Sequence, residues 1–215
     1  MKTCVLIGGG NTTDKNAPYE TEIIDKEIVK LAVKDKPNFL YIGLANSYAD
    51  SRYDQIKKIF QKLNCNTQYL KKSNVINNPT IVEQKINNSD IIYIDGGDTI
   101  KLLDYVRTYH IDSLLKQAYE KETILVGKSA GAILLAEKGL SDSYILRGEK
   151  ETYEFIDGIG IEKIKICPHY NKTKEKIIKT KINEKEIIYG IPNSSALIIM
   201  NHKIHNTNNI EIIER

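Results

Sequence analysis

The sequence predicts an α/β fold built around a mostly parallel sheet. In the first half of the chain, short β-branched runs alternate with helical patterns, which is typical of βαβ units. Beyond Gly139 the pattern becomes mixed and predicted strands dominate, so an antiparallel edge is expected in the C-terminal part. The 215 residues show no repeat and no linker. A single domain spanning residues 1–215 is therefore predicted.

The elements of the first half are predicted from their periodicity. An apolar run at residues 4–7 predicts the first strand and is followed by three glycines. Residues 20–33 place apolar side chains at helical spacing, ahead of Pro37. The same reasoning predicts strands at residues 39–42, 67–70, 91–94 and 123–126, and helices at residues 51–63, 100–106, 111–119 and 133–136. After Gly139 it predicts strands at residues 164–167, 187–189, 196–200 and 210–213.

Charge and cysteine content limit the class of partner and the compartment. The 31 basic and 28 acidic residues nearly balance, so a nucleic-acid partner is not expected. The Lys-rich stretch at residues 172–185 is interpreted as a solvated helix face. Three distant cysteines indicate reduced thiols, and neither a signal peptide nor a membrane span is predicted. We therefore expect a cytoplasmic protein with no membrane partner.

Ser129 is the candidate nucleophile. It lies in a Gly-x-Ser-x-Gly frame at residues 127–131, between a predicted strand and a predicted helix. Small neighbours allow the sharp turn that exposes a serine oxygen above the end of a strand. The alternative is a tight turn whose serine only caps the following helix.

Two further segments supply the groups that a serine nucleophile needs. Gly96 and Gly97 follow the predicted strand at residues 91–94, and the N–H groups of Gly97 and Ala130 together could form an oxyanion hole. His169 follows the predicted strand at residues 164–167 and is the best placed of four histidines to act as general base. A histidine tied into its loop by backbone hydrogen bonds is the alternative.

Four blocks of the sequence resemble the peptidase E family of serine peptidases and occur in the family's order. They are residues 95–99, 127–132, 167–170 and 190–194, which read DGGDT, GKSAGA, CPHY and GIPNS. The resemblance extends to related cyanophycinases. It implies a flavodoxin-like, doubly wound sheet with helices on both faces, related to class I glutamine amidotransferases, and hydrolysis of short peptides without a cofactor or metal.

The resemblance also assigns roles to residues. It implies Ser129 as nucleophile, His169 as base, and Gly97 with Ala130 as oxyanion donors. Gly96, Asp98 and Thr99 of the same blocks are assigned to substrate binding. Asp98 is also a predicted N-cap of the following helix, whereas Asp95, where the family more often has glycine, has no predicted role.

The sequence departs from the family at the third member of the triad. An acidic residue follows the Gly-hydrophobic-Pro step in the family, whereas this chain has Asn193 there. An asparagine oxygen can accept a hydrogen bond from the imidazole but cannot neutralise the imidazolium. Glu184 or Glu186 would substitute only if its loop reached His169. Two interpretations are preferred over that one: a weakened site that works as a dyad of Ser129 and His169, or a triad in which Asn193 orients the ring.

A second departure concerns specificity. Family members of the aspartyl dipeptidase type bind an N-terminal aspartate through an arginine, but the segment between His169 and Asn193 has no arginine. Its candidate cations are Lys172, Lys174 and Lys176. Lysine is a point charge rather than a bidentate fork, so the first-residue preference stays open.

The leading hypothesis is a peptidase E-like serine hydrolase that forms an acyl-enzyme on Ser129 and takes a small peptide as substrate. A general esterase or amidase would use the same site. A catalytically silent binding protein is the rival, because of Asn193. Glutamine amidotransfer is disfavoured, because that reaction uses a cysteine at the elbow and Cys167 is expected to pack as a small apolar residue. A homodimer is left open.

Overall fold

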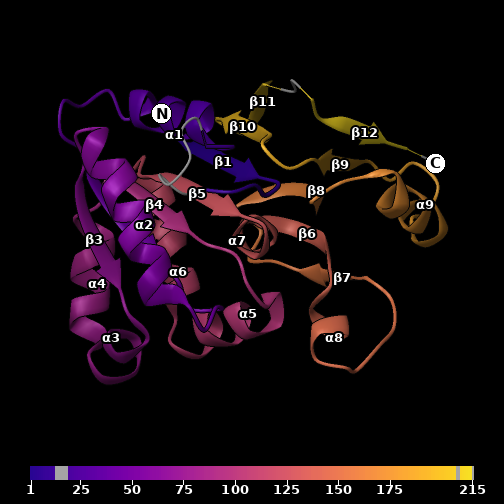
Figure 1. Ribbon diagram of the computed structural model, residues 1–215, viewed down its shortest axis with the longest axis horizontal. Helices are drawn as coiled ribbons and strands as arrows, with labels where there is room; N and C mark the ends of the chain where they lie inside the picture. The colour runs from indigo at the N-terminus through magenta and orange to yellow at the C-terminus, as the bar shows by residue number, and fades with distance from the viewer. Residues whose placement is uncertain (13–18, 207–208, 215) are drawn as a thin grey trace.

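A computed structural model describes residues 1–12, 19–206 and 209–214 and contains two sheets (Figure 1). The larger has seven strands in the order β11-β10-β1-β5-β4-β2-β3. Its parallel strands are β1 (Thr3–Ile7), β2 (Asn38–Ile42), β3 (Asn66–Leu70), β4 (Ile91–Ile94) and β5 (Ile124–Lys128). β10 (Ala196–Met200) and β11 (Lys203–Asn206) form the antiparallel edge. The predicted mostly parallel sheet with an antiparallel C-terminal edge is confirmed.

Helices cover both faces of this sheet because successive strand residues point to opposite sides. In β1, Cys4 and Leu6 belong to one core layer, and Val5 and Ile7 belong to the other. The first layer packs under α4 (Pro79–Asn87), α5 (Thr99–Thr108), α6 (Ile111–Glu120) and α7 (Ala130–Leu135). The second packs under α1 (Glu22–Leu31) and α2 (Ala49–Lys62). This is the predicted doubly wound arrangement.

A second, five-stranded sheet has the order β12-β9-β8-β6-β7. Its strands are β6 (Ala136–Ser141), β7 (Glu154–Asp157), β8 (Glu162–Pro168), β9 (Ile188–Ile191) and β12 (Glu211–Ile213). The strands predicted at residues 164–167, 187–189 and 210–213 are confirmed as β8, β9 and β12. The helix predicted at residues 133–136 instead begins at Ala130, and Ala136 already opens β6.

Several elements have no clear signal in the sequence. β6 and β7 carry glycine and charged residues where β-branched ones would mark a strand. α3 (Lys72–Asn77) and α4 lie in an asparagine-rich stretch, and asparagine is a weak helix former. α8 (Ser143–Leu146) has only four residues. Such short elements form because they pack on neighbours, which local patterns do not report.

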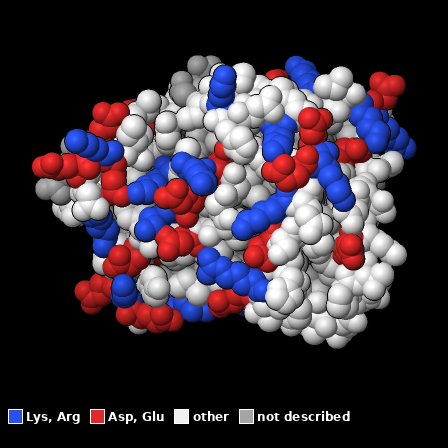
Figure 2. Space-filling model, turned by 180° about the vertical axis from the view of Figure 1, so that it is seen from behind, with Lys and Arg blue, Asp and Glu red and all other residues white. Residues whose placement is uncertain are grey.

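Of the Lys-rich stretch at residues 172–185, residues 172–181 form a helix, α9 (Lys172–Lys181), and most of its lysines are exposed. Lys181 is half-buried and Lys174 is buried. Lysine, arginine and acidic side chains are interspersed over the charged part of the face in Figure 2. No helix in the described ranges is both long and apolar enough to cross a membrane.

Candidate active site

The predicted site residues follow the carboxyl ends of strands from both sheets. Ser129 follows β5, and Gly96 and Gly97 follow β4. His169 follows β8 and Asn193 lies two residues after β9. In Figure 1 the arrowheads of β1 and β5 point toward β8, so the two sheets meet where these strands end. Loops at the carboxyl ends of strands are where open α/β sheets place their ligands.

Ser129 stands on a strained turn between β5 and α7. Its φ and ψ are 53° and −112°, outside the regions that L-residues ordinarily adopt. A Cβ on Gly127 would lie 2.3 Å from the Gly131 carbonyl oxygen, so the first glycine of the frame allows the helix to approach the strand. Ser129 is the N-cap of α7, yet its side chain makes no capping bond. Its hydroxyl lies instead 2.8 Å from Nε2 of His169.

The other ring nitrogen of His169 contacts Asn193. Nδ1 lies 2.7 Å from Asn193 Oδ1, within the range of a good hydrogen bond. When Nδ1–H donates a hydrogen bond to the amide oxygen, Nε2 carries no proton and can accept a hydrogen bond from the Ser129 hydroxyl. The predicted juxtaposition of Ser129, His169 and Asn193 is therefore present, in the order that nucleophilic catalysis requires.

The segment after β1 joins the three parts of this constellation. The carbonyl oxygens of residues 7, 8 and 9 accept, in that order, the backbone N–H groups of Ser129 (2.9 Å), His169 (2.9 Å) and Ser194 (3.2 Å). A Cβ on Gly9 would lie 2.3 Å from His169 Cε1 and 2.4 Å from Asn193 Oδ1. Only a glycine therefore lets the ring and the amide rest against this backbone.

The loop after β4 lies beside the nucleophile. A Cβ on Gly96 would be 3.6 Å from Ser129 Oγ. Gly97 has φ of 135° and packs against the backbone of Ala45, so a side chain there would be strained and obstructed. Ala130 is the first residue of α7, and its N–H therefore has no intrahelical acceptor. The loop and the helix start thus flank Ser129 as an oxyanion hole would require.

Asp98 and Thr99 support this loop. Asp98 accepts the N–H groups of Ile100 (3.0 Å) and Lys101 (3.3 Å), which confirms the predicted cap. Its carboxylate also pairs with Arg147 at 2.9 Å. Thr99 is buried, and its hydroxyl accepts a hydrogen bond from Ser141. These bonds hold the loop in place. The assignment of Asp98 and Thr99 to substrate binding stays a prediction.

The surroundings of His169 favour the neutral ring. Burial of part of the side chain lowers its pKa below the ordinary value, although much of the residue's surface is exposed. The bond to Asn193 and the charge of Asp142 oppose that shift, whereas Lys174 and Lys128 add to it. A neutral imidazole is the form that can act as general base.

Other candidates from the sequence lie elsewhere. Glu186 pairs with Lys165 and Glu184 is exposed, so the structure gives neither as a partner of His169. Lys172 pairs with Glu175. Lys174 donates to the Pro168 carbonyl at 2.9 Å, and Lys176 is exposed. Cys167 is buried in an apolar cluster, as expected.

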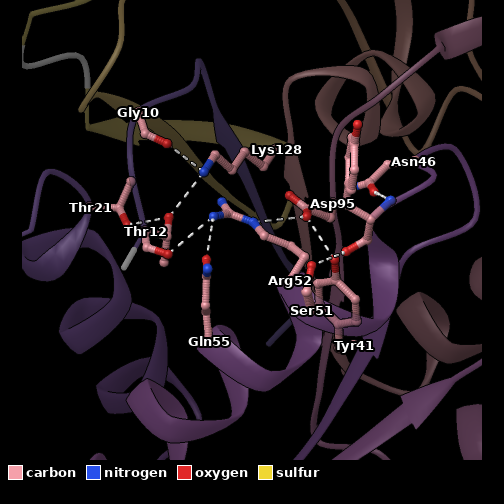
Figure 3. A network of polar contacts seen from close by, with 11 residues as sticks. Gly10, Thr12, Thr21, Tyr41, Asn46, Ser51, Arg52, Gln55, Asp95 and Lys128 are labelled. Atoms are coloured by element: carbon pink, nitrogen blue, oxygen red, sulfur yellow. Dashed lines mark hydrogen bonds and ion pairs between the residues drawn. The ribbon is translucent and has the colours of Figure 1, made fainter. Parts of the chain in front are cut away.

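A buried polar network beside the site was not predicted (Figure 3). Asp95 accepts bonds from Tyr41 (2.7 Å) and Arg52 (3.3 Å), which gives this aspartate a structural role that the sequence did not predict. Lys128, next to the nucleophile, is also buried. Within residues 1–12, 19–206 and 209–214, no three histidine, cysteine or carboxylate side chains are grouped to hold a metal ion.

Comparisons with known proteins show which family model and which relatives the chain is similar to. The family model described as Peptidase family S51 matches residues 4–207. YgaJ of Bacillus subtilis (strain 168), described as an uncharacterized peptidase, is 24% identical over 176 residues, which cover 82% of this chain and 72% of its own. Lmo0363 of Listeria monocytogenes (strain EGD-e), described likewise, is 26% identical over 129 residues, or 57% of this chain and 62% of its own.

Two crystal structures share the fold. A peptidase E candidate from Listeria monocytogenes EGD-e superposes with a TM-score of 0.70 at 18% identity, and the match covers 100% of both chains. A peptidase from an acI-B1 Actinobacterium gives a TM-score of 0.65 at 22% identity, covering 100% of this chain and 88% of that one. At these identities the similarity concerns the fold alone.

Proposed function

The chain belongs to peptidase family S51, in agreement with its resemblance to peptidase E, and we propose that it is a serine-type peptidase that hydrolyses short, dipeptide-like substrates. The observation that carries the proposal is the hydrogen-bonded chain from Ser129 Oγ through the His169 ring to Asn193 Oδ1. The family makes the protein a peptidase. The proposal adds the nucleophile, the base and the substrate size.

In the first half of the proposed reaction, Ser129 Oγ attacks the carbonyl carbon of the scissile peptide bond. His169 Nε2 takes the hydroxyl proton as the new C–O bond forms. The N–H groups of Gly97 and Ala130 bind the negative oxygen of the tetrahedral intermediate. The C–N bond then breaks, His169 returns the proton to the leaving amine, and an ester on Ser129 remains.

In the second half, water replaces the amine. His169 takes a proton from the water, which attacks the ester carbonyl, and the proton then passes to Ser129 Oγ as the acid product leaves. Apart from the substrate and this water, both halves use only groups of the chain. The three cysteines are free thiols, so we also propose that the reaction takes place in the reducing cytoplasm.

A silent binding protein of the same fold is the second candidate, and Asn193 favours it. An asparagine does not neutralise the imidazolium that forms during attack, so the barrier stays higher than with a carboxylate. A silent pocket and a slow enzyme differ in the reactivity of the serine, and this difference can be measured directly.

Labelling and hydrolysis together test the proposal. We expect a serine-directed fluorophosphonate to modify Ser129, identified by mass spectrometry of the proteolytic fragment. We also expect turnover of at least one of Asp-Leu, Glu-Leu, Ala-Leu and Asn-Leu, whose relative rates would give the first-residue preference. Hydrolysis of p-nitrophenyl acetate without any peptide turnover would favour a general esterase, and an unlabelled serine would favour the silent pocket.

The activity should persist into mildly acidic solution. The protein lowers the pKa of His169 below its ordinary value, so the neutral base survives to lower pH than in a free histidine. The acid limb of kcat/KM should therefore have its midpoint below about 6.5. A pH–rate profile of the best dipeptide measures it, and a midpoint above neutral pH would contradict His169 as a base in this environment.

A further inference from the structure

Lys128 is a buried charge next to the proposed nucleophile. It is the last residue of β5 and only 5% of its surface is exposed. Its ammonium donates to the Gly10 carbonyl oxygen at 2.6 Å and to Thr12 Oγ1 at 3.0 Å (Figure 3). Both acceptors belong to the segment that follows β1.

The ammonium is held among charges from three directions. Arg52 of α2 approaches it, and burial together with this like charge lowers the pKa of Lys128 to about 8. Three carboxylates oppose the shift, namely Asp95 after β4, Asp25 of α1 and Glu20 before α1. A buried ammonium is unfavourable unless it is bonded, and a methionine would fill similar space without that cost. Keeping the charge here therefore points to a role.

The bond to Gly10 extends a series of contacts that reaches Ser129, His169 and the loop that carries Asn193. The carbonyls of residues 7, 8 and 9 bind the N–H groups of Ser129, His169 and Ser194, and the carbonyl of residue 10 binds Lys128. Gly9, in the middle of this series, touches the ring of His169 and the amide of Asn193. A shift of the Gly10 carbonyl would therefore move the surface against which both side chains rest.

We propose that Lys128 is a positioning residue for the proposed reaction: its ammonium anchors the Gly10 carbonyl and thereby holds His169 and Asn193 in line with Ser129. The idea rests on the proposed function. It also makes an electrostatic prediction. Burial is the main cause that lowers the pKa of His169, and the charges of Lys174 and Lys128 lower it further, whereas the bond to Asn193 and the charge of Asp142 oppose the shift.

Lys128→Met tests the role, with Lys85→Met as the matched control. Lys85 of α4 also donates its ammonium to a backbone carbonyl, that of Tyr69 in the edge strand β3, at 2.8 Å. We expect kcat on the best dipeptide to fall about tenfold or more in Lys128→Met, because small misplacements of catalytic groups are costly. We expect it to stay within about twofold in Lys85→Met.

Two readouts separate positioning from general destabilisation and do not depend on turnover. In proton NMR, the low-field ring N–H resonance of His169 bonded to Asn193 should weaken or disappear in Lys128→Met and persist in Lys85→Met. The His169 pKa, followed by titrating the ring carbons, should change in the first variant only, because that variant loses both the charge of Lys128 and the bond to Asn193. If the unmodified protein neither turns over peptides nor reacts with the fluorophosphonate, the proposed function fails while these spectra still decide the role of Lys128.

Thr12→Val provides a milder variant if Lys128→Met does not fold. It removes one of the two acceptors of the ammonium and should change the His169 resonance and kcat in the same direction by less. An unchanged His169 resonance and an unchanged kcat in a folded Lys128→Met or Thr12→Val protein would overturn the proposal. So would an equal loss in Lys85→Met.

Discussion

Replacing Ser129 by alanine is expected to reduce kcat for dipeptides by at least about 10⁴-fold, because the proposed mechanism forms its acyl-enzyme on the hydroxyl that is removed. The hydroxyl is the only part of the proposed nucleophile that the change removes. The backbone should tolerate it, since alanine at φ of 53° is no more strained than serine. The melting temperature should accordingly stay close to that of the unmodified protein. Steady-state kinetics and thermal unfolding of the same preparation check both expectations.

Ser89→Ala is the matched control. Ser89 lies before β4, at the opposite end of that strand from the site, and its hydroxyl donates to the Lys85 carbonyl at 2.6 Å. Losing that hydroxyl should leave kcat unchanged and lower stability slightly. If Ser129→Ala kept the full rate, the nucleophile would have to be another residue. A loss of rate accompanied by a large fall in the melting temperature of Ser129→Ala would show that the substitution disrupts the fold rather than removes the nucleophile.

Local patterns were sufficient to predict the turn that carries Ser129 and the main sheet. Buried parallel strands such as β4, with four consecutive apolar residues, stand out in any sequence. The Gly-x-Ser-x-Gly frame gains its meaning from the strand before it and the helix after it, and both are present. His169 was found for a related reason, because a histidine directly after a strand lies at the edge where ligands bind.

The pairing of Asn193 with His169 could not be derived from spacing. Asn193 is 24 residues from His169 in sequence, and what joins them is the parallel pairing of β8 with β9 in a sheet that the sequence did not predict. The family resemblance supplied the position. The packing of β9 beside β8 supplies the contact.

The buried charges were missed for a different reason. A lysine at the end of a strand is ordinarily expected to be exposed, and no residue near Lys128 or Arg52 in the sequence indicates which group would bind its charge. Their partners lie on other elements, at Gly10, Thr12 and Asp95. One signal was available, because the three glycines after β1 indicate a backbone that something approaches closely. Gly9 does receive His169 and Asn193 in this way.

The second large effect concerns Asn193→Asp, which should raise kcat by about 10²-fold, with about 10⁴-fold as the ceiling suggested by the reverse change in a serine protease. The substitution keeps the shape, so the 2.7 Å contact with His169 Nδ1 can persist. An amide can present either its oxygen or its NH₂ group to the ring, whereas an ionised carboxylate only accepts. Aspartate therefore fixes the tautomer with Nε2 free and also stabilises the imidazolium.

The pH profile distinguishes this mechanism from a general gain. A carboxylate beside the ring favours the charged imidazole, so the acid limb of kcat/KM should move to higher pH while the plateau rises. Asn171→Asp is the control. Asn171 caps α9 by accepting the N–H of Lys174, and its amide makes only a long contact of 3.5 Å with the His169 carbonyl oxygen, so the change adds the same charge near the ring without contacting Nδ1. Its plateau should stay near that of the unmodified protein. A lower plateau in Asn193→Asp would instead show that the reaction depends on the neutral amide of Asn193 as the partner of His169.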